Sequence, residues 1–183
     1  MSPTNAADRA SAGERAKKIK LAIFDVDGVL TDGSFMVGDD GQQYKSFYTK
    51  DGQGLRMLQD SGITVGIITG RTSNVVAIRM QELGIEHVYQ GQRDKVGAFE
   101  DMLAKAGVSK DEVTYVGDDV IDLPVMRRVG LSIAVRDAEP VVKQYAHWIT
   151  SRHGGKGAVR DVCEFIMQQQ DTLDAALHKY LHG

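Results

Sequence analysis

Several features that define large classes of proteins are scarce in this sequence. Its 183 residues include one cysteine, Cys163, so no disulfide can form within the chain, which fits a reducing compartment. No apolar run approaches the roughly 18 residues that a membrane-spanning helix needs, and residues 1–20 lack the apolar stretch of a signal peptide. The net charge of −3 disfavours a dedicated nucleic-acid-binding protein. We therefore expect a cytoplasmic protein that has neither nucleic acid nor a membrane as a partner.

What the sequence does contain is ordinary for a globular domain. Hydrophobic residues make up 42% of the chain and charged residues 26%, so a core can form without a metal or a disulfide. At roughly 100–200 residues per domain, the length predicts one domain, which we place at residues 19–170. Residues 1–18 are small, polar and charged and are expected to be disordered. Residues 171–183 are expected to form a C-terminal tail.

Apolar strand-like segments alternate with segments of helical periodicity along most of the chain. The expected strands are 20–24, 63–69, 86–90, 113–117, 131–135 and 147–150. The expected helices are 52–61, 73–83, 94–106, 120–129, 138–145 and 156–170. Two further short strands around residues 38–41 predict a hairpin within residues 34–48. This alternation predicts an α/β three-layer sandwich, with a parallel sheet between helices, whose ligands bind beyond the carboxyl ends of the strands.

Two aspartates follow the first expected strand, in the segment DVDGVLTDG (25–33). Residues i and i+2 of an extended chain point the same way, so Asp25 and Asp27 converge and repel each other unless a cation joins them. Their oxygens suit a hard cation such as Mg²⁺. Asp25, which is ionised at neutral pH, is then a candidate nucleophile. Taken alone, however, such a pair is more often a solvated acidic loop or a helix cap.

Three further features lie at the same edge of the expected sheet. Thr69 ends the second strand, and its hydroxyl and the backbone N–H groups after it can hold a phosphate. Lys95 opens a helix, where an ammonium group can neutralise both a phosphate and the nucleophile. The third feature is an acidic cluster whose carboxylates can complete a magnesium site and orient a bound water: Asp118, Asp119 and Asp122. Each feature is weak alone, but all four in this order indicate one site.

The order of DVDGVLTDG, TGR (69–71), the lysine and GDDVID (117–122) resembles the haloacid dehalogenase superfamily of phosphohydrolases over residues 20–165. The resemblance implies a modified Rossmann fold and an enzyme that hydrolyses phosphate monoesters with Mg²⁺ as cofactor. It implies that Asp25 is phosphorylated and that Asp27 is the general acid and base, with a backbone carbonyl that also binds the metal. Asp118 matches the third metal ligand of the family, and Thr69 and Lys95 match the residues that hold the phosphate.

The intervals between these motifs leave no room for a cap domain, because the hairpin and one helix fill the chain from Asp25 to Thr69. A site without a cap is open to water, so either the substrate is a macromolecule or a neighbouring subunit supplies the missing wall, and we favour the second. Arg56, Arg71 and Arg79 add positive charge near the expected site, and guanidinium groups suit bidentate binding of carboxylate or phosphate. These arginines favour a small substrate with both groups, although Arg56 and Arg79 taken alone are more often solvated helix residues.

The finer pattern resembles one branch of the superfamily, the 3-deoxy-D-manno-octulosonate 8-phosphate phosphatases of lipopolysaccharide biosynthesis. The segments that carry it are DVDGVLTDG, YTKDGQGLRML, ITGR, YQGQRDK and GGKGAVRDVCEFI. It implies a homotetramer whose active sites lie at subunit interfaces. The chain departs from the branch in its closing segment, where Asp161 stands in place of a glutamate. The resemblance matches these residues to substrate contacts: Asp27, Tyr48, Thr49, Lys50, Asp51, Gly52, Arg56, Arg71, Arg79 and Lys95.

Two alternatives stay open on the sequence alone. A phosphatase for the phosphate ester of a nine-carbon sugar acid would carry the same site, and composition does not separate the two substrates. A phospho-receiver signalling module uses the same residue types around Mg²⁺, but its phosphorylated aspartate lies on the third strand, whereas Asp25 follows the first. Repeated release of phosphate from p-nitrophenyl phosphate would exclude such a switch.

Overall fold

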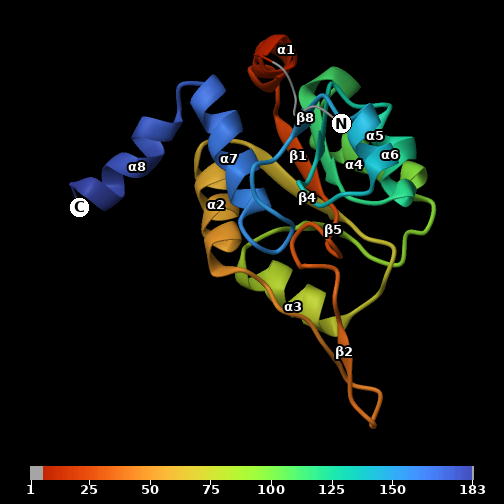
Figure 1. Cartoon of the computed structure of the whole chain (residues 1–183). Helices are drawn as coiled ribbons and strands as arrows, with labels where there is room; N and C mark the ends of the chain where they lie inside the picture. Colours follow the sequence, from red (N-terminus) through yellow and green to blue (C-terminus); the bar gives the residue numbers. More distant parts are fainter. Residues whose placement is uncertain (1–5, 183) are drawn as a thin grey trace.

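The computed structural model describes residues 6–182, and at their centre lies a six-stranded parallel sheet (Figure 1). The strands in spatial order are β5 (His87–Tyr89), β4 (Thr64–Ile68), β1 (Leu21–Phe24), β6 (Val113–Gly117), β7 (Leu131–Ala134) and β8 (Trp148–Ile149). Strand β1 lies in the middle, with Phe24 opposite Ile67 of β4 and Val116 of β6. Each observed strand begins and ends within one residue of its expected bounds.

Helices cover both faces of the sheet and complete the predicted three layers (Figure 1). One face carries α1 (Ala6–Ala16), α2 (Thr49–Asp60) and α7 (Ala158–Gln169), with α3 (Asn74–Glu82) beside α2; the other carries α4 (Lys95–Ala106), α5 (Leu123–Met126) and α6 (Pro140–Tyr145). Between β1 and α2 the chain adds only the predicted hairpin of β2 (Met36–Val37) and β3 (Gln43–Tyr44). The described part of the chain therefore contains no cap domain.

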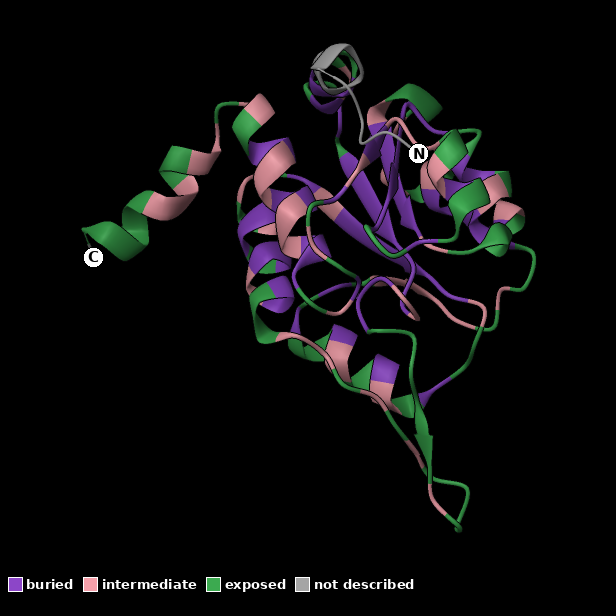
Figure 2. Cartoon of the chain, viewed as in Figure 1, coloured by how far each residue is buried: buried purple, intermediate pink, exposed green. Residues whose placement is uncertain are grey.

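The middle of the sheet is buried on both faces (Figure 2). Every residue of β1, β6 and β7 is buried, whereas the edge strand β5 is half-buried. Central parallel strands covered on both sides need a nearly continuous apolar sequence, as in LAIF (21–24). Helix α7 adds the stripe that the sequence predicts, with Val159, Val162, Cys163 and Ile166 all buried. The central strands β1, β6 and β7 thus contain no charged residue.

The expectation of disorder for residues 1–18 is wrong for most of that segment. Residues Ala6–Ala16 form α1, while residues 1–5 lie outside the described part of the chain. Ala12 and Ala16 are fully buried, and Gln170 Nε2 donates hydrogen bonds to Ala16 O (2.9 Å) and Ile19 O (2.8 Å). The small side chains that suggested disorder instead allow α1 to pack closely on α7.

Three other elements differ from their expected form. The helix expected at 120–129 is a 3₁₀ turn, Val120–Asp122, followed by the short α5, whose second residue is Pro124. Proline fits the first turn of a helix because no intrahelical hydrogen bond needs its N–H. Helix α2 begins three residues earlier than expected, so residues 49–52 form its first turn and not a loop. The C-terminal tail contains α8 (Leu173–Leu181), none of whose residues is buried.

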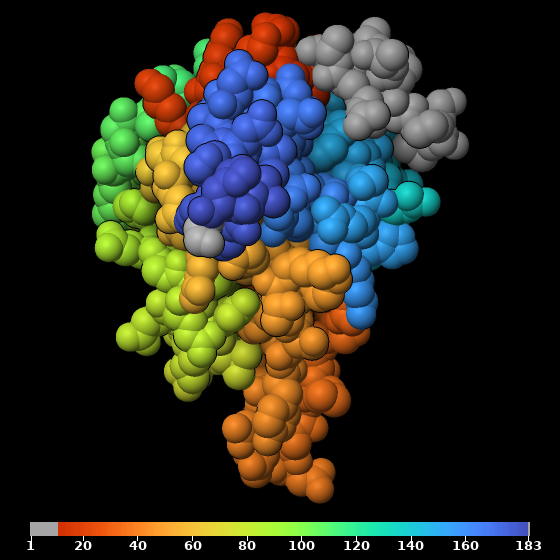
Figure 3. All heavy atoms as spheres, turned by 90° about the vertical axis from the view of Figure 1, so that its left-hand side faces the viewer, coloured from red at the N-terminus to blue at the C-terminus, as the bar shows by residue number. Residues whose placement is uncertain are grey.

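The hairpin projects beyond the body of the protein, from the edge where the strands end (Figure 3). Its large exposed apolar side chains are Phe35, Met36, Val37 and Tyr44. Among residues 6–182, no helix combines the length and the apolar character that crossing a bilayer requires.

Candidate active site

Asp25 lies directly beyond the central strand β1, where β4 and β6 also end. Its N–H continues the sheet ladder and donates to Val116 O at 3.0 Å. Thr69 leaves β4 beside it, with its N–H bonded to Tyr89 O and its carbonyl to Gln92 N, both at 2.9 Å. Both side chains are almost completely buried. The rigid sheet therefore holds Asp25 and Thr69 at the edge where the sequence predicts them.

Lys95 joins two carboxylates inside the protein. It is the first residue of α4, and its side chain is completely buried. Its Nζ lies 2.7 Å from Asp122 Oδ1, 3.0 Å from Asp25 Oδ1 and 3.1 Å from the Tyr115 hydroxyl. The contact with Asp25 is an ion pair outside hydrogen-bond geometry, whereas Asp122 accepts a hydrogen bond. Burial by itself lowers the pKa of Lys95, but the charges of Asp25 and Asp122 raise it above its ordinary value, so the ammonium group stays charged.

Asp122 uses both of its carboxylate oxygens. Oδ1 accepts hydrogen bonds from Lys95 and from the Tyr115 hydroxyl (2.7 Å), and Oδ2 accepts from the N–H groups of Asp118 (2.9 Å) and Asp119 (3.2 Å). The sequence places Asp119 and Asp122 around the metal site, and in the structure Asp122 holds Lys95 and the backbone of Asp118. Asp119 is exposed and caps the turn that follows. Tyr115 escaped prediction because it reads as one more apolar residue of a buried strand.

Three carboxylates meet next to Lys95. One oxygen each from Asp25, Asp118 and Asp122 lies within 4.8 Å of the others. Asp118 Oδ1 is buried and has no hydrogen-bond partner in the described part of the chain. Burial, and after it repulsion from Asp122, raises the pKa of Asp25 to about 7 and the pKa of Asp118 to about 8. This excess of buried negative charge and the unpaired oxygen fit a hard divalent cation such as Mg²⁺, which favours the ionised form of both groups.

Gly28 allows the loop after β1 to lie against Asp118. A Cβ at Gly28 would lie 2.0 Å from Asp118 Oδ2, and the φ angle of +91° is one that side chains disfavour. Thr31 closes the same loop, because its Oγ1 donates to Val26 O (3.3 Å) and accepts from Gly33 N (3.2 Å). Both residues belong to the motif that the sequence shows. The contact of Gly28 with Asp118, however, joins segments that only the tertiary structure brings together.

Asp27 has a partner that sequence reasoning missed. Lys45, which follows β3, forms an ion pair with Asp27 Oδ1; its own side chain is completely buried, while that of Asp27 keeps 22% exposure. The base of the hairpin is also held by Arg71, whose guanidinium group stacks on the Phe35 ring at 4.0 Å. The sequence offered no signal for Lys45, because lysines beside hairpin strands are mostly solvated.

The other predicted substrate contacts do not form one cluster within the chain. The exposed or half-exposed residues Tyr48, Thr49 and Lys50 lie at the start of α2. Arg56 donates to Glu82 O at 2.9 Å, and Arg79 pairs with the Glu82 side chain at 3.2 Å. A Cβ at Gly52 would lie 2.4 Å from Arg79 Nη2. Gly52, Arg56 and Arg79 therefore lie together at the last turn of α3.

Asp51 is not available for a substrate, so the contact predicted for it needs correction. Its side chain is buried, Oδ1 accepts a hydrogen bond from Arg160 N (2.8 Å), and Oδ2 accepts one from Gly157 N (3.3 Å). Gly157 is the N-cap of α7 and has no side chain with which to cap the helix. The carboxylate of Asp51 takes that place.

The fold and the site define a class of protein: an α/β enzyme with a carboxylate cluster, fit for a divalent cation, at the carboxyl end of its sheet. A family model described as haloacid dehalogenase-like hydrolase matches residues 85–162. The 3-deoxy-D-manno-octulosonate 8-phosphate phosphatase of Yersinia pestis is 48% identical over 163 residues, which cover 89% of this chain and 87% of that protein. A crystal structure of the Yersinia pestis enzyme has a TM-score of 0.89 at 47% identity, covering 90% of this chain and 89% of that one.

A further solved structure carries ligands. The 3-deoxy-D-manno-octulosonate 8-phosphate phosphatase of Moraxella catarrhalis, in complex with a magnesium ion, a phosphate ion and a KDO molecule, has a TM-score of 0.90 at 41% identity. The similarity covers 92% of this chain and 97% of that one. This protein belongs to the 3-deoxy-D-manno-octulosonate 8-phosphate phosphatase family of the haloacid dehalogenase-like hydrolases. The predicted fold, the phosphoric monoester hydrolase activity and the magnesium cofactor are thereby confirmed.

Proposed function

We propose that this protein hydrolyses 3-deoxy-D-manno-octulosonate 8-phosphate to the free sugar acid and inorganic phosphate, as a step of lipopolysaccharide biosynthesis. The observation that carries the proposal is the burial of Asp25 between Lys95 and Asp118 at the carboxyl end of the sheet. The choice of substrate is supported by the name of the Yersinia pestis relative and by the KDO molecule in the Moraxella catarrhalis complex.

The proposed reaction has two half-reactions, both at Asp25. Its carboxylate attacks the phosphorus, the bond to the sugar oxygen breaks, and Asp27 gives a proton to the leaving alkoxide. A water then attacks the phosphorus of the aspartyl-phosphate, while Asp27 takes a proton from that water. The bond to Asp25 breaks, which releases phosphate, restores the nucleophile and leaves Asp27 protonated for the next substrate.

Charge neutralisation is the main requirement of such a transfer. Magnesium, when held by the carboxylates of Asp25 and Asp118 and the backbone carbonyl of Asp27, offsets the repulsion between the anionic nucleophile and the anionic ester. Lys95 adds a second positive charge beside Asp25, and the Thr69 hydroxyl holds a phosphate oxygen. Asp122 keeps Lys95 in place and exchanges no proton in this scheme.

We further propose a cytoplasmic homotetramer whose active sites lie at subunit interfaces. Support comes from the exposed apolar side chains of the hairpin, which association would bury, and from the open, capless edge of the sheet. In that arrangement Arg71 binds the substrate carboxylate from the base of the hairpin, and Tyr48, Thr49, Lys50, Gly52, Arg56 and Arg79 line the same or a neighbouring site. Light scattering should give four times the chain mass of 20.0 kDa; a monomer would contradict this part of the proposal.

The substrate is tested by phosphate release from a panel of esters, with Mg²⁺ and with EDTA. We expect multiple turnovers of p-nitrophenyl phosphate, which a receiver module cannot perform, and the highest kcat/KM for 3-deoxy-D-manno-octulosonate 8-phosphate. A higher kcat/KM for a nine-carbon sugar acid phosphate would replace the substrate and keep the mechanism. Preference for nucleotides would contradict a sugar acid substrate altogether.

A further inference from the structure

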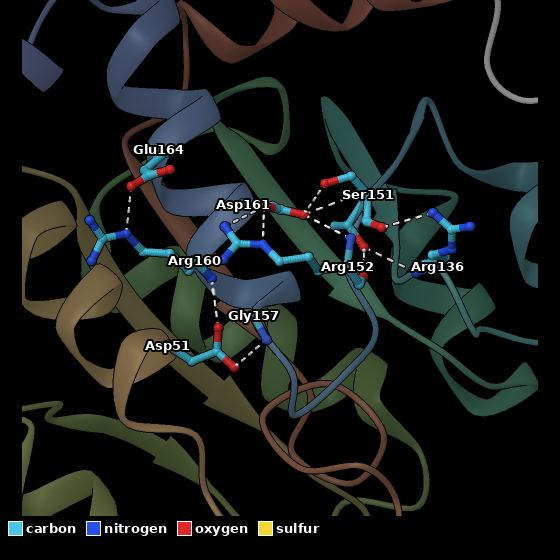
Figure 4. A network of polar contacts seen from close by, with 9 residues as sticks. Asp51, Arg136, Ser151, Arg152, Gly157, Arg160, Asp161 and Glu164 are labelled. Carbon is cyan, nitrogen blue, oxygen red and sulfur yellow. Dashed lines mark hydrogen bonds and ion pairs between the residues drawn. The ribbon is translucent and has the colours of Figure 1, made fainter.

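Asp51 caps α7, whose N-cap residue Gly157 lies 106 positions later in the chain (Figure 4). Its carboxylate, 1% exposed, accepts hydrogen bonds from the N–H groups of Arg160 and Gly157 at the start of α7. These donors have no partner within the helix, and a carboxylate also interacts favourably with the positive end of the helix dipole. The first turn of α2, which contains Asp51, is thereby locked to the first turn of α7.

Residues 153–157, which precede α7 and which we call the glycine segment, pack backbone to backbone on residues 25–33, the catalytic loop. Gly155 N donates to Val29 O at 2.9 Å. A Cβ at Gly154 would lie 1.7 Å from Gly28 O, and one at Gly155 would lie 2.4 Å from the backbone of Thr31. Such an approach is possible only without side chains, so the two segments cannot shift independently.

Two further aspartates hold the glycine segment and the chain before it. Asp137 Oδ1 accepts from Gly154 N at 2.9 Å. Asp161, in the first turn of α7, accepts from the N–H groups of Ser151 (3.1 Å) and Arg152 (2.9 Å) and pairs with the Arg152 guanidinium group (Figure 4). Asp161, which departs from the family's sequence pattern, therefore has partners at both of its carboxylate oxygens. The glycine segment is anchored from several sides, and Asp51 is the anchor that reaches it from α2.

We infer that Asp51 is a positioning residue for the catalytic loop, acting through the start of α7 and the glycine segment. The contacts run from Asp51 to Gly157, along the glycine segment to the backbone of Gly28, and so to the loop that carries Asp25 and Asp27. Gly28 also lies against Asp118, so a displaced loop changes the spacing between the carboxylates. The inference rests on the proposed phosphatase function, and it gives Asp51 a role in place of the substrate contact.

The first test is Asp51→Asn, which keeps the size of the side chain but turns an N–H donor toward a backbone N–H. Misplacing a reacting group costs rate, so kcat should fall at least about tenfold with KM within about twofold. The same factor should apply to 3-deoxy-D-manno-octulosonate 8-phosphate and to p-nitrophenyl phosphate, which has no sugar acid. A rise in KM for the sugar acid phosphate alone, with p-nitrophenyl phosphate unaffected, would make Asp51 a substrate contact and overturn the inference.

Cys163→Ala is the matched control for lost stability. Cys163 lies between α2 and α7, the two helices that Asp51 joins. A Cβ at Gly54 of α2 would lie 3.4 Å from the Cβ of Cys163. Both variants are assayed well below their unfolding temperatures. Under these conditions Cys163→Ala should have the kcat of the unsubstituted protein, even if it lowers Tm as much as Asp51→Asn does. Equal losses of kcat in the two variants would reduce Asp51 to a structural role. Amide exchange of Gly155 should accelerate in Asp51→Asn and not in the control.

A second pair of variants tests the glycine segment if Asp51→Asn does not fold. Gly155 and Gly107 have φ angles of +61° and +65°, but a Cβ at Gly107 meets nothing within 4 Å. Both alanine variants carry the same backbone strain, and only Gly155→Ala presses on the catalytic loop. Gly155→Ala should lose at least about tenfold in kcat on p-nitrophenyl phosphate, against less than about twofold for Gly107→Ala. Equal kcat values of the two alanine variants would overturn the inference. If the unsubstituted protein turned over p-nitrophenyl phosphate but not the sugar acid phosphate, only the proposed substrate would be refuted.

Discussion

The ammonium group of Lys95 lies 2.7 Å from Asp122 Oδ1, and neither side chain is exposed to solvent. A buried pair of this kind orients more than it stabilises, because removing two charges from water costs several kcal/mol. Here the pair aims Lys95 at Asp25, while the second oxygen of Asp122 holds the backbone of Asp118. One buried residue therefore places both the positive charge and the metal-binding carboxylate that the proposed reaction needs.

Replacing Lys95 with methionine should remove activity and lower stability together. The change leaves Asp25 and Asp122 buried without their ammonium group, and breaking a buried pair costs about 3–5 kcal/mol. Urea unfolding in the absence of divalent cations measures the loss. Lys105→Met is the control, because Lys105 pairs with Asp101 on the surface, where such a pair contributes about 1 kcal/mol or less. Equal free energies of unfolding of the two variants would show that the buried pair contributes no more to stability than the surface pair.

Asp25→Asn should abolish turnover and keep the fold. An amide is not a nucleophile toward phosphorus, so kcat should fall by about 10³-fold or more. The near-ultraviolet circular dichroism spectrum should stay unchanged, and Tm should hold or rise, because the change removes one of three crowded carboxylates. Asp60→Asn, at a surface pair with Lys179, should keep full activity. Turnover above a trace in the Asp25 variant would remove this residue from the nucleophile's role.

Without divalent cations, the contribution of Asp25 and Asp118 to stability should decrease as pH rises. Their folded pKa values of about 7 and about 8 lie above the ordinary value of 3.8, so the folded state binds protons that the unfolded state has released. The contribution is complete below pH 3.8 and is lost as pH passes through 7 and 8. Mg²⁺ should therefore raise Tm more at pH 8 than at about pH 5, where protons compete with it. Thermal unfolding in EDTA and in Mg²⁺ measures this, and a pH-independent effect of Mg²⁺ would contradict the carboxylate cluster as its site.

Arg71→Ala should separate recognition of the sugar acid from chemistry. Losing a charge-assisted hydrogen bond of about 1.5–3 kcal/mol should raise KM for the sugar acid phosphate at least tenfold. Turnover of p-nitrophenyl phosphate, which has no carboxylate, should stay unchanged. Phe35→Leu is the control for the lost stacking contact, and Arg71→Lys should recover the affinity only in part. Equal losses on both substrates would place Arg71 in the chemical step.

Local sequence was enough to predict the positions of Asp25, Thr69, Lys95 and Asp118. Each follows a buried apolar strand or opens a helix, and the carboxyl ends of parallel strands meet at one edge. The alternating pattern also predicted every strand of the central sheet. The same reasoning failed for α1, because small residues are typical both of disordered tails and of helices that pack closely on a neighbour.

Sequence reasoning missed the contacts of three residues whose roles depend on a tertiary partner. Lys45 reads as a solvated lysine, Tyr115 as a core residue and Asp51 as a ligand contact, and each description fits the local sequence. Their actual contacts are with Asp27, Asp122 and the start of α7. No periodicity or spacing encodes such pairs, since they depend on which loops the packed helices bring together.

The sequence by itself determined the parallel α/β sheet, the acidic edge of that sheet and the order of its reacting groups, because strand and helix periodicity and the residues at strand ends are local properties. Only the tertiary structure decided which of the charged residues face one another. Burial makes an unpaired charge costly, and folding brings partners to both carboxylate oxygens of Asp51 and of Asp122, which hold the site together. Asp25 and Asp118 each keep one buried oxygen without a hydrogen-bond partner in the described part of the chain, which fits the proposed binding of a metal and a phosphate.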